Sequence, residues 1–305
     1  MIRWILVALL LLLPLSVNAE VLWQENYDGI TERKTASISS VAAPQKIHGA
    51  QMDWLAWVGI LTTDTYDEET HPTGEIAGPG RGGAGQCLRI WKRNGIWKDY
   101  HGYMNYELSE EEFANHYREL YCRMYIRLPV GMACANAVSS KINRYYWGSS
   151  QGDTTKGEFH FVLGGNWPSG RLLLITPGAD GTTSYQTAAE MGIADGEWHC
   201  YEIYLKAPTP GQADGVASLW IDGEKAADDY QGDFDGTFAD GEYISRLLTP
   251  ALGNITGESA TWNFPTSGWY CIEFDDFVVS TSYIGPDDPP SGTTTIRASG
   301  TAGWR

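Results

Sequence analysis

The stretch 195–223, DGEWHCYEIYLKAPTPGQADGVASLWIDG, holds two strand patterns separated by a turn. In the first pattern, Tyr201, Ile203 and Leu205 alternate with polar or amphipathic side chains such as Glu202, which is the period of a strand with one apolar face. PTPGQAD supplies turn residues, and the final IDG favours a hairpin because Asp-Gly adopts the backbone angles that a tight hairpin needs. The stretch therefore predicts consecutive antiparallel strands.

Similar strand patterns recur along the chain with turn residues between them, in QCLRIWKR, LYCRMYIRLP, SKINRYYWG, GEFHFVLGG, RLLLITPG and WYCIEFDDFVVST. This spacing predicts an all-β fold, an antiparallel β-sandwich, and not alternating βα units. One short helix is expected at 109–120, SEEEFANHYREL, where Ser109 and Glu112 form a capping box. We expect this helix to run directly into the strand that starts at Leu120.

The two ends of the chain differ in composition from the rest. Residues 1–19 have a basic start, an apolar run of about ten residues and small residues at the end, which is typical of a secretory signal cleaved after Ala19. The run is shorter than the roughly 20 residues that span a bilayer, and no later segment is apolar enough to do so. We expect a secreted protein with one domain at 20–286, followed by a Pro/Gly/Ser/Thr-rich linker or tail at 287–305.

The formal net charge is −17 at pH 7. This balance disfavours nucleic acid as a partner, because phosphates require a basic footprint, although a local basic cleft on an acidic body could still bind an acidic polysaccharide. Five cysteines are present, and in an oxidising compartment some of them should pair, leaving at least one free. Their spacing matches no zinc site; they are Cys87, Cys122, Cys134, Cys200 and Cys271.

Several strands oppose an apolar row with aromatic and hydrogen-bonding side chains. In KGEFHFVLGG (156–165), Phe159 and Phe161 alternate with Glu158 and His160. Aromatic rings interleaved with polar groups suit sugars, whose C–H faces stack on the rings while the hydroxyls bond the neighbours. On this pattern the expected substrate-binding residues are Trp91, Arg123, Lys141, Asn143, Trp147, Glu158 and Lys206. The alternative is that these aromatic side chains are structural and pack under loops.

The order of these features resembles the concanavalin A-like lectin/glucanase superfamily. The residues that carry the resemblance are the stretch 195–223 and the closing segment WYCIEFDDFVVSTSYIG at 269–285. In that superfamily the final strand pairs with the N-terminal one, which here would be EVLWQENYDGI at 20–30. The resemblance implies a jelly roll of two curved sheets that binds extended polysaccharide in a concave groove, and the chain looks closest to polysaccharide lyases.

The chain departs from two better-marked branches of that superfamily. It lacks the Glu-x-Asp-x-x-Glu glucanase signature, which disfavours hydrolysis by two carboxylates. It also lacks the Gln-x-His strand of the usual alginate lyases, since GEFHF has Glu158 in the place of the glutamine. Superfamily members often bind a structural calcium near the terminal strands, and Glu25, Asp28 and Asp276 could provide carboxylate ligands, with hydrated surface acids as the alternative.

Three functions follow from this pattern. The first is a carbohydrate-binding protein that needs only the aromatic groove. The second is a lyase that cleaves a uronic-acid polymer by β-elimination, with His160 as base, Tyr145 or Tyr204 as acid, and Arg89 or another cation or amide to neutralise the carboxylate. The third is a structural or adhesive protein without catalysis. Elimination further requires that these side chains meet at one point.

Overall fold

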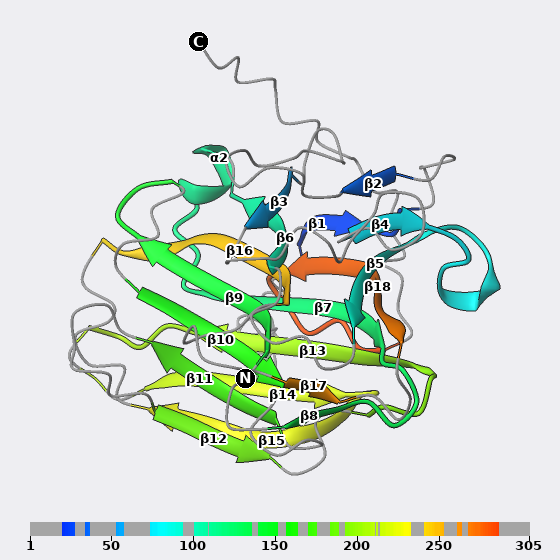
Figure 1. Cartoon of the computed structure of the whole chain (residues 1–305). Coiled ribbons are helices and arrows are strands. Elements are labelled where there is room, and N and C mark those ends of the chain that lie inside the picture. Colours follow the sequence, from blue (N-terminus) through cyan, green and yellow to red (C-terminus); the bar gives the residue numbers. More distant parts are fainter. Residues whose placement is uncertain are drawn as a thin grey trace, which may run out of the picture.

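The protein folds as two facing antiparallel sheets in a computed structural model (Figure 1). The structure describes residues 20–27, 34–36, 53–57, 74–93, 101–108, 110–135, 140–151, 157–163, 170–175, 184–188, 193–210, 212, 214–232, 241–252, 261–263 and 268–286, in some strands for the backbone only. The expected export signal at 1–19 and the tail at 287–305 lie outside these ranges. No helix within them is long and apolar enough to cross a membrane.

The first sheet has nine strands. Its order is β15 (Glu224–Gly232), β14 (Gly215–Ile221), β13 (Trp198–Lys206), β7 (Glu119–Arg127), β18 (Trp269–Ser280), β5 (Cys87–Arg93), β4 (Gly74–Ala77) and β2 (Lys34–Ala36), and β1 (Val21–Glu25) also pairs with β18. The pairing of β1 with the closing strand confirms the expectation from the sequence. The predicted hairpin at Asp222 is the turn between β14 and β15, where Asp222 has a φ of 52°.

The second sheet has seven strands. Its order is β12 (Ser184–Ala188), β11 (Gly170–Ile175), β10 (Gly157–Leu163), β9 (Ser140–Gly148), β16 (Tyr243–Leu252), β6 (His101–Glu107) and β3 (Asp53–Trp57). A separate two-stranded sheet joins β17 (Thr261–Asn263) to β8 (Ala133–Ala135). This all-β sandwich confirms the predicted fold class.

The core lies between the two large sheets and explains why they face each other. As predicted, alternate residues of β7 point inward, and Cys122, Met124 and Ile126 are fully buried there. The seven-stranded sheet contributes residues such as Trp147 and Phe159 to the same cluster. Burying large aromatic side chains from both layers gives each sheet one face that cannot be exposed to water without a large cost.

The helical segment is shorter than predicted. The α-helix α2 covers only Glu110–Phe113, and a single turn of 3-10 helix, η1, covers Arg81–Gly83. His116 has a φ of 59°, a left-handed conformation that a continuing right-handed helix excludes. The prediction that the helix runs into β7 is therefore wrong, because the chain turns at His116 before β7 begins at Glu119.

Candidate functional site

The predicted site residues divide between the two sheets. Arg89, Trp91, Arg123, Tyr204 and Lys206 lie on β5, β7 and β13 of the nine-stranded sheet. The other residues predicted for substrate binding and catalysis lie on β9 and β10 of the seven-stranded sheet; they are Lys141, Asn143, Tyr145, Trp147, Glu158 and His160. The two sheets turn their outer faces in opposite directions, so the structure does not bring the predicted set together in one groove.

Three predicted residues of β9 point into the core, which corrects their assignment to a ligand-binding face. Asn143, Tyr145 and Trp147 each have 0% exposure. The Tyr145 hydroxyl donates to the carbonyl oxygen of Ile203 on the opposite sheet at 3.1 Å, and Asn143 Nδ2 donates to the Cys122 sulfur at 3.4 Å. Burial raises the pKa of Tyr145 well above its ordinary value. This buried hydroxyl therefore ties the two sheets together.

The residue next to Tyr145 lies on the other face of β9. Tyr146 stands outside the core cluster and keeps 9% exposure, and its Cα partner on β16 is Arg246. Arg246 is partly exposed, whereas Leu247 beside it is buried in the core. The seven-stranded sheet thus has an outer face on which a phenol and a guanidinium occupy adjacent strands.

A β-bulge in β16 gives Arg246 this position. The pairing with β9 shifts between Ile244 and Arg246, so that Ser245 is the additional residue. Ile244 and Leu247 are both core residues, although a regular strand would place positions three apart on opposite faces. Ser245 is fully buried, and its hydroxyl donates to the Tyr146 carbonyl at 3.4 Å. Bulges of this kind re-aim a side chain and occur often beside active sites.

The backbone pairing also relates the predicted residues of β9 and β10. His160 is the Cα partner of Arg144, and Glu158 is the partner of Tyr146. The register shifts between Phe161, which pairs with Asn143, and Val162, which pairs with Lys141. The side chains of Lys141, Glu158 and His160 lie outside the described part of the structure, so the structure gives their strand positions only.

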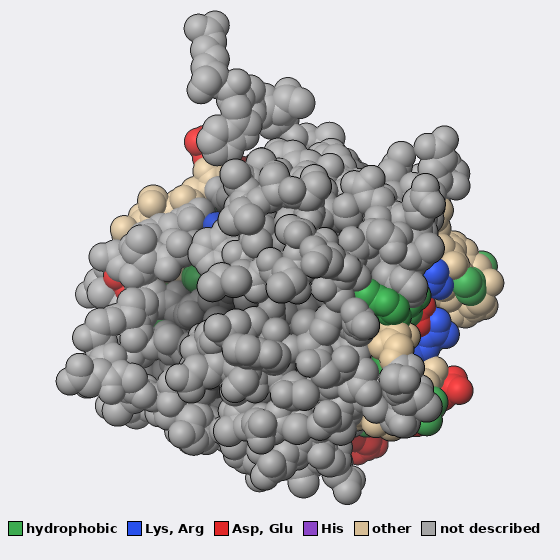
Figure 2. All heavy atoms as spheres, viewed as in Figure 1, with side chains coloured by type: hydrophobic (Ala, Val, Ile, Leu, Met, Phe, Trp, Pro, Cys, Tyr) green, Lys and Arg blue, Asp and Glu red, His purple; other side chains and the backbone are tan. Residues whose placement is uncertain are grey.

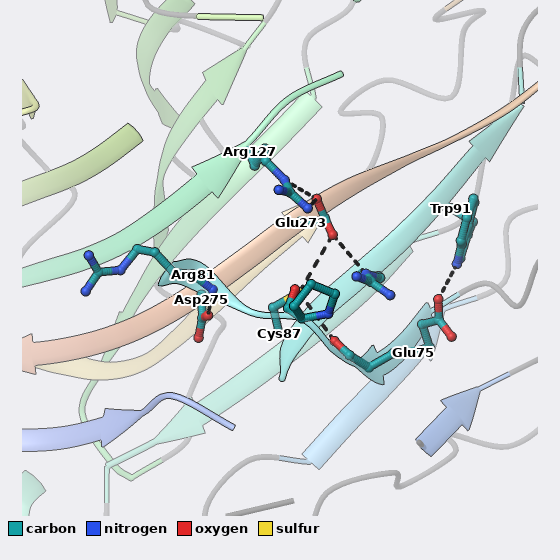
Figure 3. Close-up of polar contacts among 10 residues, drawn as sticks. Glu75, Arg81, Cys87, Trp91, Arg127, Glu273 and Asp275 are labelled. Atoms are coloured by element: carbon teal, nitrogen blue, oxygen red, sulfur yellow. Dashed lines mark hydrogen bonds and ion pairs between the residues drawn. The ribbon is translucent and has the colours of Figure 1, made fainter. Parts of the chain in front are cut away.

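On the outer face of the nine-stranded sheet, two arginines share one carboxylate. Arg89 Nε donates to Glu273 Oε1 at 2.8 Å, and the Arg127 guanidinium donates to Glu273 Oε2 (Figure 3). Trp91 Nε1 donates to Glu75 Oε1 at 2.8 Å in the same region. Arg89 and Trp91, predicted for catalysis and binding, thus hold neighbouring strands together.

Figure 2 shows basic, acidic and hydrophobic side chains close together on the surface where Figure 1 places the loop between β4 and β5.

Arg123 fastens the C-terminal segment across this face. The side chain has 3% exposure, and its Nη1 donates to the Gly285 carbonyl at 3.0 Å. Beside it, Glu202 accepts hydrogen bonds from the Ile284 and Gly285 amides at 2.7 and 2.8 Å. Burial raises the pKa of Glu202, and these two amide bonds partly oppose that shift. Arg123 therefore binds the chain itself, and the substrate-binding role expected from the sequence stays a prediction.

Tyr204 belongs to an aromatic cluster on the same sheet. It stacks on Tyr121 with ring centroids 4.5 Å apart, and its hydroxyl donates to Glu119 at 2.8 Å. Tyr121 also contacts Tyr283 of the C-terminal segment. Lys206, at the end of β13, is partly exposed and is the Cα partner of Glu119. Tyr204 and Lys206 are therefore separated from β10 by the thickness of the sandwich.

The expected calcium ligands have other partners where the structure describes them. Glu25 accepts a hydrogen bond from the Tyr27 amide at 2.7 Å, and Asp276 forms an ion pair with Arg81. Asp28 lies outside the described residues. Among the described residues no group of three potential ligands could hold a metal ion. Calcium binding at these positions stays a prediction from the sequence.

The four cysteines whose side chains are described carry free thiols, and Cys134 is not among them. Burial raises the pKa of Cys200 and Cys271 to about 12, which makes both poor nucleophiles at neutral pH. The expectation that these cysteines form cross-links within the chain is not met for Cys87, Cys122, Cys200 and Cys271.

Comparison with known proteins finds similarity in structure only: no protein-family profile matches the sequence, and no curated protein does. An alginate lyase from Aplysia kurodai superposes with a TM-score of 0.53 and 12% identity over 85% of this chain and 98% of that one. An endo-β-1,4-glucuronan lyase from Trichoderma reesei gives a TM-score of 0.42 and 13% identity over 83% of this chain and 96% of that one. A carbohydrate esterase from a Shiga toxin-encoding bacteriophage gives a TM-score of 0.45 and 14% identity over 86% of this chain and 98% of that one. The chain has the concanavalin A-like jelly-roll fold seen in the first of these proteins.

Proposed function

We propose that the protein is a polysaccharide lyase that cleaves a uronic-acid polymer by β-elimination on the outer face of the seven-stranded sheet. The observation that carries this proposal is the adjacency of Tyr146 and Arg246 on that face, opposite the core residues Tyr145 and Leu247. The alginate lyase of similar fold supports the same substrate class. A fold alone does not specify chemistry, so the assignment depends on the residues of this face.

β-Elimination sets three requirements for this face. A cation must neutralise the uronate carboxylate so that the proton on the adjacent ring carbon becomes removable. A base removes that proton, the electron pair forms a carbon–carbon double bond, and the bond to the glycosidic oxygen breaks. An acid then protonates the leaving oxygen. Atoms balance without water or a redox partner, and one new chain end carries the double bond.

Arg246 and Tyr146 match two of these roles. The guanidinium of Arg246 can bind a carboxylate in a bidentate manner through its planar set of N–H donors. Tyr146 presents a phenol in the neighbouring position across the strand pair. We assign Arg246 to the carboxylate and Tyr146 to protonation of the leaving oxygen.

His160 is the base in this proposal. Phe159 is buried in the core with 1% exposure, and successive residues of a strand alternate between faces, so we place His160 on the outer face. Its Cα partner Arg144 is two positions before Tyr146 on β9. Imidazole titrates near neutral pH and is therefore suited to removing a proton.

The register shift between β9 and β10 adds Lys141 to this face. A strand without a bulge would place Lys141 on the same side as Asn143, which is in the core. The extra residue reverses that relationship, because Lys141 pairs with Val162, whereas a regular register would pair it with Leu163. We infer that Lys141 is a second cation near the substrate, as the sequence predicts for substrate binding.

Incubation of the mature protein with a panel of uronate polymers tests the proposal, with the absorbance of the unsaturated product as the readout. Formation of product from one polymer, and its loss in Arg246→Ala, supports elimination on this face. Retention of a polymer without product would instead favour the carbohydrate-binding function, for which the same aromatic and cationic face suffices. If no polymer is cleaved or retained, the proposal is wrong and a structural or adhesive role gains support.

A further inference from the structure

His199, at the start of β13, lies between two carboxylates. Its Nδ1 is 2.6 Å from Asp222 Oδ2 in the turn between β14 and β15. Its Nε2 is 3.1 and 3.2 Å from the two carboxylate oxygens of Asp195, in the loop that precedes β13. The His199 side chain is 14% exposed, while both aspartates are about half exposed.

The hydrogen-bond partners decide the protonation state of this ring. An ionised carboxylate accepts hydrogen bonds and donates none, whereas a neutral imidazole has one N–H and one acceptor nitrogen. Both ring nitrogens of His199 face carboxylate oxygens, so both bonds form only when the ring is a doubly protonated imidazolium. Loss of one proton would leave a nitrogen lone pair directed at a carboxylate oxygen.

Each aspartate is itself fixed to the surrounding backbone. Asp222 Oδ1 accepts a hydrogen bond from the Cys200 amide at 2.8 Å, and the Asp222 amide donates to the Cys200 carbonyl at 2.9 Å. Asp195 Oδ1 accepts from the Glu197 amide at 2.9 Å. The loop around Asp195 also reaches the end of β7, where the Gly196 amide donates to the Leu128 carbonyl. His199 thus connects this loop to a turn of a different hairpin.

The other groups around the ring do not replace these contacts. On β7, the Cα partner of His199 is the apolar Ile126. Glu197 in the loop and Glu224 after the turn are further acidic groups of the same two segments, and both are exposed. Tyr201, two residues along β13, adds no charge beside the ring: its phenol is neutral at neutral pH, and burial raises its pKa further. The nearby cation, Arg127, lies over the Trp198 ring.

We propose that Asp195, His199 and Asp222 form a pH-sensitive clamp that fastens the loop before β13 to the β14–β15 turn and opens as the pH rises. The turn residue Gly223 also lies against Pro286, since a Cβ added there would meet Pro286 Cγ at 3.2 Å. Opening of the clamp would therefore loosen the turn that supports the C-terminal segment as well as the loop.

The direction of the pH dependence follows from linkage. The pKa of His199 is raised from its ordinary value of 6.5: burial opposes this shift, but the hydrogen bonds and charges of Asp222 and Asp195 exceed it. A basic group with a raised pKa in the folded state contributes stability that is fully present below its unfolded pKa. That contribution is lost as the pH rises from 6.5 through the raised folded value.

Proton NMR of the full chain tests the clamp through the titration of the His199 ring, assigned by the resonance that disappears in His199→Gln. We expect a pKa above 6.5, and a lower value in Asp195→Asn than in the wild type. The control Glu197→Gln removes an exposed charge from the same loop without removing a partner of the ring, so it should leave the titration nearly unchanged. A wild-type pKa at or below 6.5, or equal shifts in both variants, would overturn the proposal.

Unfolding by urea at a series of pH values gives a second readout. The free energy of unfolding of the wild type should fall as the pH rises above 6.5, and this fall should be smaller in His199→Gln. His116→Asn is the matched control, because His116 is exposed, has a left-handed φ of 59° that asparagine tolerates, and stacks on Tyr243 away from the clamp. An unaltered pH dependence in His199→Gln would contradict the clamp. If His199→Gln fails to fold, Asp195→Asn serves in its place with the same expected direction.

Discussion

The adjacent tyrosines of β9 provide a matched pair of substitutions that separates folding from catalysis. Tyr145→Phe removes a hydroxyl that bonds the Ile203 carbonyl across the fully buried interface between the sheets. Tyr146→Phe removes a hydroxyl from the outer face of the same strand. Both changes delete one oxygen atom, and the two positions differ chiefly in the face of the sheet that they occupy.

The two variants are expected to differ in their effects on the free energy of unfolding and on kcat. A typical intramolecular hydrogen bond contributes about 1 kcal/mol net, so Tyr145→Phe should lower the free energy of unfolding by about that amount. For a domain of this size, that corresponds to a fall in melting temperature of about 2–4 °C. If Tyr146 is the acid, its loss should reduce kcat by about 100-fold to 10,000-fold, which is roughly 3–5 kcal/mol in the activation barrier.

The assay combines thermal unfolding with the rate of appearance of the unsaturated product. We expect Tyr145→Phe to be less stable yet to retain kcat within about threefold, which corresponds to under 1 kcal/mol in the barrier. Tyr146→Phe should retain most of its stability and lose activity. A Tyr146→Phe variant with wild-type kcat would refute its role as the acid. Equal loss of activity in both variants would refute the assignment of the two faces.

Three further predictions concern the nine-stranded sheet and the thiols. Glu202→Gln leaves one acceptor oxygen for two backbone amides, so hydrogen exchange at Ile284 and Gly285 should accelerate, and unchanged exchange would contradict the anchoring of this segment. Glu273→Gln removes the carboxylate shared by two arginines and should lower the free energy of unfolding by about 1.5–3 kcal/mol in urea titration without changing kcat; a loss of kcat would place this cluster in the active site. The described thiols are Cys87, Cys122, Cys200 and Cys271. Alkylation of the denatured, unreduced protein followed by mass spectrometry should label all of them, and a disulfide-linked peptide between any two would contradict the structure.

Alternation along single strands could be predicted from the sequence because it depends on local apolar periodicity. The inward-facing residues of β7 and β13, such as Met124 and Ile203, follow directly from that pattern. The pattern failed on β9, where the sequence NRYYW offers large side chains to both faces. Periodicity gave no reason there to choose Tyr145 or Tyr146 for the interior.

The position of the site depends on contacts between strands, which local periodicity does not contain. The sequence places Arg89 and His160 on strands of similar character, yet they belong to different sheets. Arg246 was missed because β16 contains Pro250 and a bulge at Ser245 that interrupts its alternation. The sequence signal that could have identified Arg246 is an apolar alternation that shifts by one residue within a strand, with an arginine next to the shift.

Hydrogen exchange with and without a uronate oligosaccharide tests the central claim that ligands bind the outer face of the seven-stranded sheet. Slower exchange on binding should be concentrated in β9, β10 and β16, where Tyr146, His160 and Arg246 lie. Protection confined to β5, β7 and β13 would contradict the claim and would return the binding site to Arg89, Trp91 and Tyr204.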